Sequence, residues 1–593
     1  MESADKVRKV TKVLTIMAWS TFVLVVAVTV IGGLYATWRL NDDRPVSYAS
    51  DTEHFKYGST GGERGWKLQF GFGIPYWLWI ALPELAPDLL PDGQSGKGYS
   101  SLGLVYEDDR NPMFDLPIGT SMRRVQGIDR VYLNCAFCHT GSVRDTPGAE
   151  RQIVLGMPSN TVSLGAFALF LDGAAKSRKF REQEVMAKVT ELEHLRDRWL
   201  AQTEAGSDDR YRPAPWGFID RAIMRWYGIM AMRNQLLSFM GRLSFIDFAT
   251  AGPGRVDTFN SPKALLGFDM HGAGVDPDEL FGNVDFPSIW NQKARRGMNL
   301  HWDGNQCSTD ERNLSAAFGT GATPATLDKE RLLRVANWLW DQARPPSFPA
   351  ERIDSNRLDR GEHLYRQYCW QCHGNGQPPF REQGDGSKVG EVEPIEAIRT
   401  DRGRLDSYTP ALAVNQNTIY AGFPESGEAH CREYLESICN PSVPEADFEQ
   451  LRKTFLDDCY PARFSHFRKT FGYANVPLDG IWLRAPYLHN GSVPNLRALL
   501  EPAVNRPPVF YTGYDVYNYE SVGFVTQPMC GEPQAQQWCV AQGDPEQSVP
   551  DGAGWRFDTS LDGNHNFGHE GPEYGTELSG DDKQALLEYL KTF

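Results

Sequence analysis

The longest uninterrupted apolar stretch of the chain lies near its N-terminus. Residues 13–37 carry no charged side chain and are long enough to cross a bilayer as a helix. The preceding segment is basic, with Lys6, Arg8, Lys9 and Lys12. Because basic segments stay in the cytoplasm, we expect a cytoplasmic tail over 1–12, a transmembrane anchor over 13–37, and everything after Arg39 outside the cytoplasm. A cleaved signal peptide is the alternative interpretation.

Apolar positions recur at helical spacing in several later segments. The predicted helices cover residues 181–202, 219–248, 328–342, 355–372 and 581–593. Recurrence at three and four residues is typical of a helix with one buried face. Pro213 and Pro215 separate the first two helices, and Ser579 is placed to cap the last one. Because no stretch is convincingly rich in strands, we expect a mainly α fold.

The pattern Cys-x-x-Cys-His occurs twice in the chain. Its residues are Cys135, Cys138 and His139, and again Cys369, Cys372 and His373. This spacing is typical of c-type haem attachment, in which two thiols hold the porphyrin and the histidine binds iron from one side. A zinc site built from the two cysteine pairs is the alternative, but zinc does not require a histidine directly after each second cysteine. We therefore expect two covalently bound haem c groups, with His139 and His373 as iron ligands.

The length of 593 residues allows more than one domain. The proline-rich run 344–349 ends the helix over 328–342 and favours a domain boundary. We expect an N-terminal c-type haem domain with a helical insertion over 38–345 and a C-terminal cytochrome c domain over 350–593. A helix leading into the haem motif and a helix at the end of the domain are the plan of small cytochrome c domains, here with long loops between them. Since c-type haem is attached outside the cytoplasm, we expect a single-pass protein of the bacterial inner membrane with its haem domains in the periplasm.

The formal net charge is -16, which argues against nucleic acid as a partner and favours a basic redox protein. Aromatic residues make up 12% of the chain, with 16 tryptophans, a richness that suits haem pockets. As electron donor we expect a small protein such as a cytochrome c, or a membrane complex that oxidises quinol. The membrane itself is the other expected partner.

Six further cysteines lie outside the haem motifs: Cys307, Cys431, Cys439, Cys459, Cys530 and Cys539. An oxidising compartment permits disulfides, so we expect some bridging in the C-terminal half and no redox catalysis by thiols. The sequence leaves the pairing open.

Each iron has a second side, away from His139 or His373, and the residue there decides what the haem can do. An iron with an open position binds peroxide or dioxygen, whereas an iron with two protein ligands relays electrons. For the first haem the nearest candidate is Met157, with a role in core packing as the alternative. For the second haem the candidates are His466, His489, His565 and His569. The arginines beside His466 also suit a role as partner of a haem propionate.

Two runs and the chain ending carry a resemblance to a known superfamily. They are 286–291 leading to His301, Trp302, Asp303 and Gly304; 483–492; and Gly568, His569 with Tyr574, Gly575 and Thr576. The first two resemble the signatures of bacterial di-haem cytochrome c peroxidases, and the ending looks closest to their rubber-oxygenase-like branch. The resemblance covers about 95–593. The di-haem enzyme that matures methylamine dehydrogenase is similar in the same way.

The resemblance implies roles for individual residues. Trp302 matches the tryptophan between the two haems, and His489 matches a histidine near the second haem that does not clearly ligate it. His569 looks like the distal ligand of the second iron, although the four residues before Tyr574 make a wider gap than expected and leave His565 as an alternative. A calcium ion lies between the domains in relatives, but no ligand motif here demands one.

These observations favour a membrane-anchored peroxidase-like oxidoreductase, with peroxide or dioxygen at the N-terminal haem and electron relay through the C-terminal haem. The relay would use Trp302, and Glu311 and Arg312 are the candidates for moving protons to the leaving oxygen. A solvated helix start is the alternative for both. The alternative function is a pure electron-transfer subunit of a respiratory chain, and oxidation of a partner protein is a third.

Overall fold

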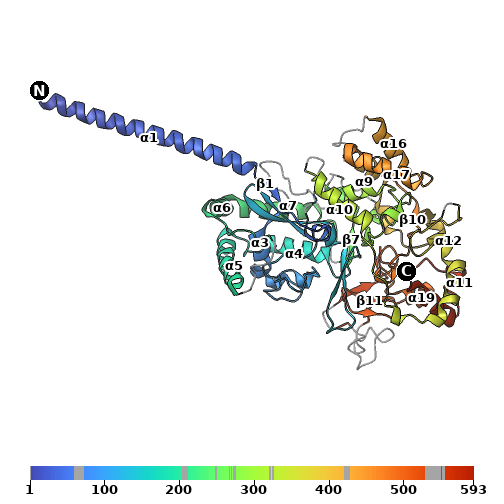
Figure 1. Cartoon of the computed structure of the whole chain (residues 1–593). Coiled ribbons are helices and arrows are strands. Elements are labelled where there is room, and N and C mark those ends of the chain that lie inside the picture. The colour runs from blue at the N-terminus through green and yellow to red at the C-terminus, as the bar shows by residue number, and fades with distance from the viewer. Residues whose placement is uncertain are drawn as a thin grey trace.

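The apolar N-terminal run forms one helix, α1 (Glu2–Leu40), in a computed structural model of the chain. Figure 1 shows α1 projecting away from the rest of the protein. Its stretch Thr11–Leu40 is long and apolar enough to cross a membrane, and none of it is buried. A signal sequence near an N-terminus has the same character.

The structure describes most of the chain. The described residues are 2–58, 60, 73–202, 211–247, 250–265, 268, 270, 276–319, 322, 326–382, 384–419, 428–460, 463–527, 549–550 and 554–593. About 47% of the chain is helical, which confirms the helical character expected from the sequence. The division into two haem domains stays a prediction.

A four-stranded antiparallel sheet follows α1, in the strand order β1-β3-β4-β2. Its strands are β1 (Asp43–Pro45), β2 (Ile74–Pro75), β3 (Thr120–Val125) and β4 (Ile128–Leu133). The hairpin turn between β3 and β4 uses Gln126 and Gly127, both with left-handed backbone angles. Sequence periodicity missed this sheet because both of its faces are covered. Even Arg123 and Arg130 are buried within it, so polar and apolar residues do not alternate as in a half-exposed strand.

Helices surround this sheet in the first half of the chain. They are α2 (Asp51–Tyr57), α3 (Tyr76–Leu85), α4 (Leu164–Lys176), α5 (Glu182–Gln202), α6 (Phe218–Ile223) and α7 (Ile229–Arg242). The helix predicted over 181–202 is confirmed by α5. The one predicted over 219–248 corresponds to α6 and α7, joined by a π-helical turn, η5 (Met224–Gly228). Its predicted end was wrong, because α7 ends at Arg242 and residues 243–247 are not helical; residue 248 lies outside the described residues.

Three helices connect the halves: α8 (Asn260–Leu265), α9 (Thr309–Gly319) and α10 (Lys329–Asp341). The prediction over 328–342 is confirmed by α10, and Asp328 caps its N-terminus. Trp338 of α10 stacks on Phe55 of α2 with ring centroids 4.4 Å apart. The same hydrophobic cluster includes Leu364 and Trp482, so the two halves share one core.

The second half is built around two crossing helices. Helix α11 (Leu358–Tyr368) and the short α12 (Trp370–His373) lead through the second haem motif, and α19 (Gly580–Leu590) closes the chain. A Cβ atom on Gly361 would lie 2.2 Å from the carbonyl oxygen of Ala585, so glycine permits the close approach of α11 and α19. Ser579 caps α19 as expected. The helices predicted over 355–372 and 581–593 are therefore confirmed.

The other helices are short and lie in long connections: α13 (Ile395–Ile398), α14 (Gly403–Ser407), α15 (Pro410–Ile419), α16 (Ala429–Ser437), α17 (Glu445–Thr454), η12 (Phe455–Cys459) and α18 (Leu496–Leu499). The paired strands are β5 (Thr140–Val143) with β6 (Gln152–Leu155), β7 (Arg255–Asp257) with β8 (Asn283–Asp285), β9 (Val392–Pro394) with β10 (Gly472–Ala474), β11 (Val509–Thr512) with β14 (Trp555–Asp558), and β12 (Tyr517–Asn518) with β13 (Gly523–Phe524).

Candidate haem sites

The first Cys-x-x-Cys-His motif begins in a tight turn directly after β4. The Asn134 side chain accepts a hydrogen bond from the Ala136 amide at 3.0 Å and donates to the carbonyl oxygens of Lys56 and Gly58 at 3.1 Å each. A single amide side chain thus joins the motif to the end of α2. This arrangement holds Cys135 and Cys138 in one rigid turn.

His139 is oriented by a carbonyl group from a distant segment. Its Nδ1 lies 2.9 Å from the carbonyl oxygen of Pro287. A ring that donates through Nδ1 keeps Nε2 as the nitrogen for a metal. Burial, reinforced by the positive charge of Arg312, lowers the pKa of His139 to about 4. The imidazole is therefore neutral at physiological pH, which is the form that ligates metals.

The second motif repeats this arrangement. His373 Nδ1 lies 2.8 Å from the carbonyl oxygen of Val476, and burial lowers the pKa of His373. Both candidate ligands are therefore neutral, and each is held through Nδ1 by a backbone carbonyl.

The ring of His569 faces the ring of His373. The two ring centroids lie 6.3 Å apart. Two imidazoles that bind one metal from opposite sides place their centroids roughly 6 Å apart, since each metal–nitrogen bond is about 2 Å. Burial, followed by repulsion from His373, lowers the pKa of His569 to about 3. The structure thus brings together two neutral imidazoles at a spacing that suits a metal between them.

The other candidate histidines of the second site have protein partners. His466 uses both ring nitrogens, at 2.6 Å from Glu311 Oε1 and 3.1 Å from the carbonyl oxygen of Leu435. His489 Nε2 lies 3.0 Å from the Tyr473 hydroxyl, and His565 Nδ1 lies 2.8 Å from Asp401 Oδ2. Of these described histidines, only His466 is thus shown with both ring nitrogens engaged. The bond of His565 uses Nδ1, as in His139 and His373, and leaves Nε2 for a metal, so His569 is distinguished by its ring facing His373.

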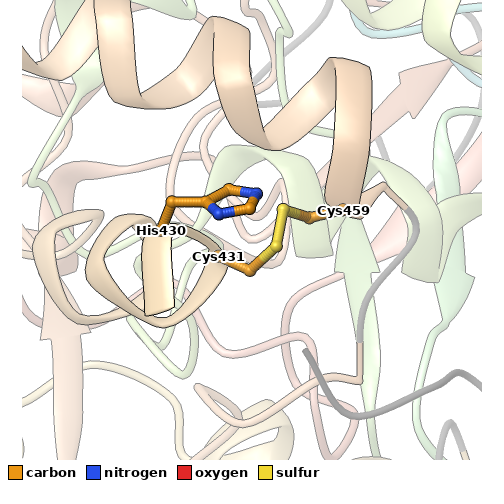
Figure 2. A group of neighbouring side chains, drawn as sticks. All are labelled: His430, Cys431 and Cys459. Carbon is orange, nitrogen blue, oxygen red and sulfur yellow. A yellow bond between two sulfur atoms is a disulfide. The ribbon is translucent and has the colours of Figure 1, made fainter. Parts of the chain in front are cut away.

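The cysteines divide into two groups. Cys135, Cys138, Cys369 and Cys372 are free thiols, whereas the other four described cysteines form the disulfides Cys307–Cys439 and Cys431–Cys459. The expected bridging in the C-terminal half is confirmed for Cys431–Cys459, and Cys530 and Cys539 lie outside the described residues. His430 lies beside this disulfide (Figure 2), but sulfurs bonded to each other do not offer thiolates to a metal. Free thiol pairs next to neutral histidines fit two covalently attached haems.

Trp302 lies between the segments that hold the two motif histidines. Its indole Nε1 donates to the carbonyl oxygen of Asp285 at 2.9 Å, and Asp285 is two positions before Pro287. Its own carbonyl oxygen accepts from the Ala474 amide at 2.7 Å, and Ala474 is two positions before Val476. A chain of hydrogen bonds and short backbone segments therefore connects the His139 ring to the His373 ring through Trp302.

Glu311 and Arg312 are neighbours on α9 with different surroundings. The Glu311 carboxylate is buried and accepts hydrogen bonds from Gln306 Nε2 at 3.0 Å and from the Ser465 amide at 3.3 Å. It also pairs with His466 at 2.6 Å. Burial opposes the charged ring, but the hydrogen bond and charge of Glu311 prevail and raise the pKa of His466. The Glu311 carboxylate is thus engaged in a buried pair.

The positive charge of Arg312 instead affects the first haem motif, where, in addition to burial, it lowers the pKa of His139. Burial and repulsion from Arg295 lower the pKa of Arg312 to about 10, while the negative charge of Asp310 acts in the other direction. Its guanidinium makes a long contact of 3.5 Å with Asn313 Oδ1. It therefore keeps hydrogen-bond donors for a group bound near Cys135.

Met157 fills the core beside the first motif. Its side chain is fully buried, and the neighbouring Gly156 amide donates to the carbonyl oxygen of His139 at 2.8 Å. A Cβ atom on Gly141 would lie 2.6 Å from the Met157 sulfur. Close packing onto the strand that follows His139 supports the core role for Met157.

Some residues near the motifs carry no sequence signal. The Tyr460 hydroxyl is buried and has no hydrogen-bond partner among the described residues. Burial, followed by the negative charge of Asp310, raises its pKa well above the usual value. Pro287 and Val476 act through backbone carbonyls, which any residue type provides. Only the position of Pro287 in the run 286–291 could have drawn attention to it.

One segment of the chain matches a known family. Residues 472–511, which include Val476 and His489, match the family described as RoxA-like, cytochrome c-like. The match supports the rubber-oxygenase-like branch of cytochrome c proteins. It implies haem c as a cofactor and suggests a haem oxidoreductase.

Two curated relatives come from Sinorhizobium fredii. The chain is 29% identical over 326 residues to uncharacterized protein y4iM, an alignment that covers 52% of this chain and 64% of the relative. It is 28% identical over 278 residues to uncharacterized protein y4iJ, covering 42% of this chain and 41% of the relative. The alignments span less than two thirds of either relative.

Proposed function

We propose that this protein is a membrane-anchored di-haem c-type cytochrome that acts as a peroxidase-like oxidoreductase, with peroxide or dioxygen at the N-terminal haem and electron relay through the C-terminal haem. Haem c supplies a redox-active iron that relays electrons when both axial positions are filled and binds an oxidant when one is open. Cys135 and Cys138 would hold the first haem, with Cys369 and Cys372 holding the second. His139 and His373 would be the proximal ligands.

The observation that carries the proposal is the His373–His569 pair. His373 and His569, two neutral imidazoles with centroids 6.3 Å apart, would both hold the iron of the second haem, which would then relay electrons. At the first motif Arg312, whose charge acts on His139, donates hydrogen bonds and does not ligate iron. The same charge also acts on the ring of His301. The character of Arg312 supports an open first site, in contrast to the second.

The reaction at the first haem would use three further residues. Arg312 would stabilise negative charge on the leaving oxygen of a bound peroxide. Glu311, paired with His466, would hold α9 in place and provide a buried carboxylate for proton transfer. Trp302 would position the connection between the two histidines through its bonds to Asp285 and Ala474.

The cellular location and the electron donor that we propose are argued from helix α1 and from the net charge of the chain. A helix that can span a membrane would anchor the haem domains on the periplasmic side of a bacterial inner membrane. The net charge of -16 would attract a small basic electron donor such as a cytochrome c. A membrane complex that oxidises quinol is the other donor that an anchored protein can reach.

A pure electron-transfer subunit is the second candidate function, and the His373–His569 pair also supports it. Optical and EPR spectra of the full-length protein, oxidised and reduced, with and without carbon monoxide, separate the two. One high-spin haem whose reduced spectrum shifts with carbon monoxide is the expected result. Two low-spin haems that ignore carbon monoxide in both redox states would overturn the oxidoreductase and leave the relay.

A further inference from the structure

The helical segment 218–242, made of α6, η5 and α7, has apolar side chains both in the core and on its exposed surface. Met224, Ile229 and Met232 belong to the hydrophobic core of the first half. Phe218, Ile219, Trp226 and Met230 are exposed by 89%, 44%, 79% and 56%. We call these four residues the 218–230 patch. A helix whose outer face contacts water normally carries polar residues at such positions.

The patch is defined by the exposure of its four side chains. The π-helical turn η5 (Met224–Gly228) interrupts the α-helical spacing between Ile219 and Trp226, whereas Trp226 and Met230 follow one another in the next turn of the segment. Contiguous exposed apolar surface of this kind marks a contact with another apolar phase or molecule. The large exposed fraction of Trp226 is notable because tryptophan is enriched where proteins meet membrane interfaces.

The patch begins where α1 joins the body of the protein. Arg39, in the last turn of α1, forms an ion pair with Asp220 of α6 at 2.5 Å, and both side chains are mostly shielded from solvent. Figure 1 shows α6 near the end of α1 from which the chain enters the folded body. Phe218 and Ile219 directly precede Asp220. If α1 spans a bilayer, the patch therefore starts at the level where the helix leaves it.

The charge of the same segment is opposite to that of the whole chain. Residues 218–242 contain four arginines and one aspartate, in a protein with a net charge of -16. The arginines are Arg221, Arg225, Arg233 and Arg242. Arg221 pairs with Glu193, and Arg225 lies 3.9 Å from Glu182, so neighbouring glutamates offset part of this positive charge. The Arg225 guanidinium lies 5.8 Å from the Trp226 ring centroid, at the border of the patch. Arginines beside an apolar face are typical of helices that bind anionic membrane surfaces.

We propose that the 218–230 patch inserts into the headgroup region of an anionic phospholipid bilayer, so that the body of the protein is docked on the membrane as well as tethered to it. The inference rests on the anchor in the proposed function and on no haem chemistry. Two attachments, α1 and the patch, restrain rotation of the folded body. The folded body then keeps a constant orientation relative to the membrane.

A nitroxide label tests the patch in the full-length protein reconstituted into vesicles of phosphatidylglycerol and phosphatidylcholine. The label is placed on Trp226→Cys and, in a second variant, on Met230→Cys. The matched control is Val504→Cys, because Val504 is 87% exposed and lies far along the chain from α1 and α6. The native chain, treated with the same reagent, reports any labelling of its own cysteines.

We expect labels at 226 and 230 to be relaxed by dissolved oxygen and shielded from a water-soluble nickel chelate, with the opposite result for the label at 504. Equal access of the chelate to all three labels would overturn the proposal. Shielding that grows with the protein-to-lipid ratio would indicate contact between copies of the chain, which also overturns it. Flotation of the unlabelled protein with vesicles reports the anchor separately, so that failure of the anchor and failure of the patch are distinguishable.

Discussion

The carboxylate of Glu311 and the ring of His466, 155 positions apart in the sequence, lie 2.6 Å from each other in the interior. The pair raises the pKa of His466 in the folded state. A group with a raised folded-state pKa stabilises the protein fully below its unfolded pKa, about 6.5 for histidine. This contribution is lost as the pH rises through the folded-state pKa.

We therefore expect His466→Gln to reduce the free energy of unfolding more at pH 6 than at pH 9, with a difference on the order of 1 kcal/mol. Urea unfolding followed by near-ultraviolet circular dichroism at both pH values measures it. The exposed His194, changed to Gln, is the control and should have little effect at either pH. A larger effect of His466→Gln at pH 9 would contradict the assignment of the pair.

His569→Ala tests the facing imidazoles. Removing one of two axial ligands should convert the second haem from low spin to high spin and let its reduced form bind carbon monoxide. The control is His565→Ala, in the same loop, whose ring bonds to Asp401. If His565→Ala changes the spectrum while His569→Ala does not, His565 is the ligand.

Trp302→Phe keeps an aromatic ring but removes the N–H that bonds to the Asp285 carbonyl. We expect electron transfer between the haems to slow by roughly tenfold, which corresponds to about 1.4 kcal/mol in barrier height. Stopped-flow reduction with separate detection of the two haems measures it. Trp482→Phe removes a similar bond, to the Pro346 carbonyl at 3.1 Å, and should leave the rate unchanged. Equal slowing in both variants would assign Trp302 to packing.

Arg312→Gln removes the charge that acts on the first motif. If Arg312 stabilises the leaving oxygen, kcat/KM for peroxide should fall by about a hundredfold, with the spectrum of the second haem unchanged. Arg334→Gln, which breaks an exposed pair with Asp51, is the control for loss of an arginine. Unchanged turnover in Arg312→Gln would exclude this role.

The two disulfides should differ in their contribution to stability. Cys307–Cys439 closes 132 positions of chain and Cys431–Cys459 closes 28. Chain entropy predicts losses of about 5 and about 4 kcal/mol for the paired serine variants. Thermal unfolding of the two double variants gives the order, and the lower Tm is expected without Cys307–Cys439. The reverse order would show that local packing around α16 and α17 outweighs chain entropy.

Local sequence patterns were sufficient to predict those elements and motifs that depend on residues close together in the chain. The apolar run of α1, the Asp328 and Ser579 caps and the spacing of the Cys-x-x-Cys-His motifs all act between residues close together in the chain. For that reason α1, α5, α10, α11 and α19 were predicted, whereas the β3–β4 hairpin was missed because buried arginines remove its alternation.

The tertiary structure decided which residues meet. His139 and His373 find their carbonyl partners at Pro287 and Val476, 148 and 103 positions away, and no residue type marks a backbone carbonyl in a sequence. The resemblance favoured His569 for the second iron, with His565 as the alternative, and the fold places the His569 ring opposite that of His373. The sequence by itself determined which cofactor chemistry the chain can hold, because covalent attachment depends on local spacing. Only the fold decided which side chains surround each site, because those contacts join segments that are far apart in the chain.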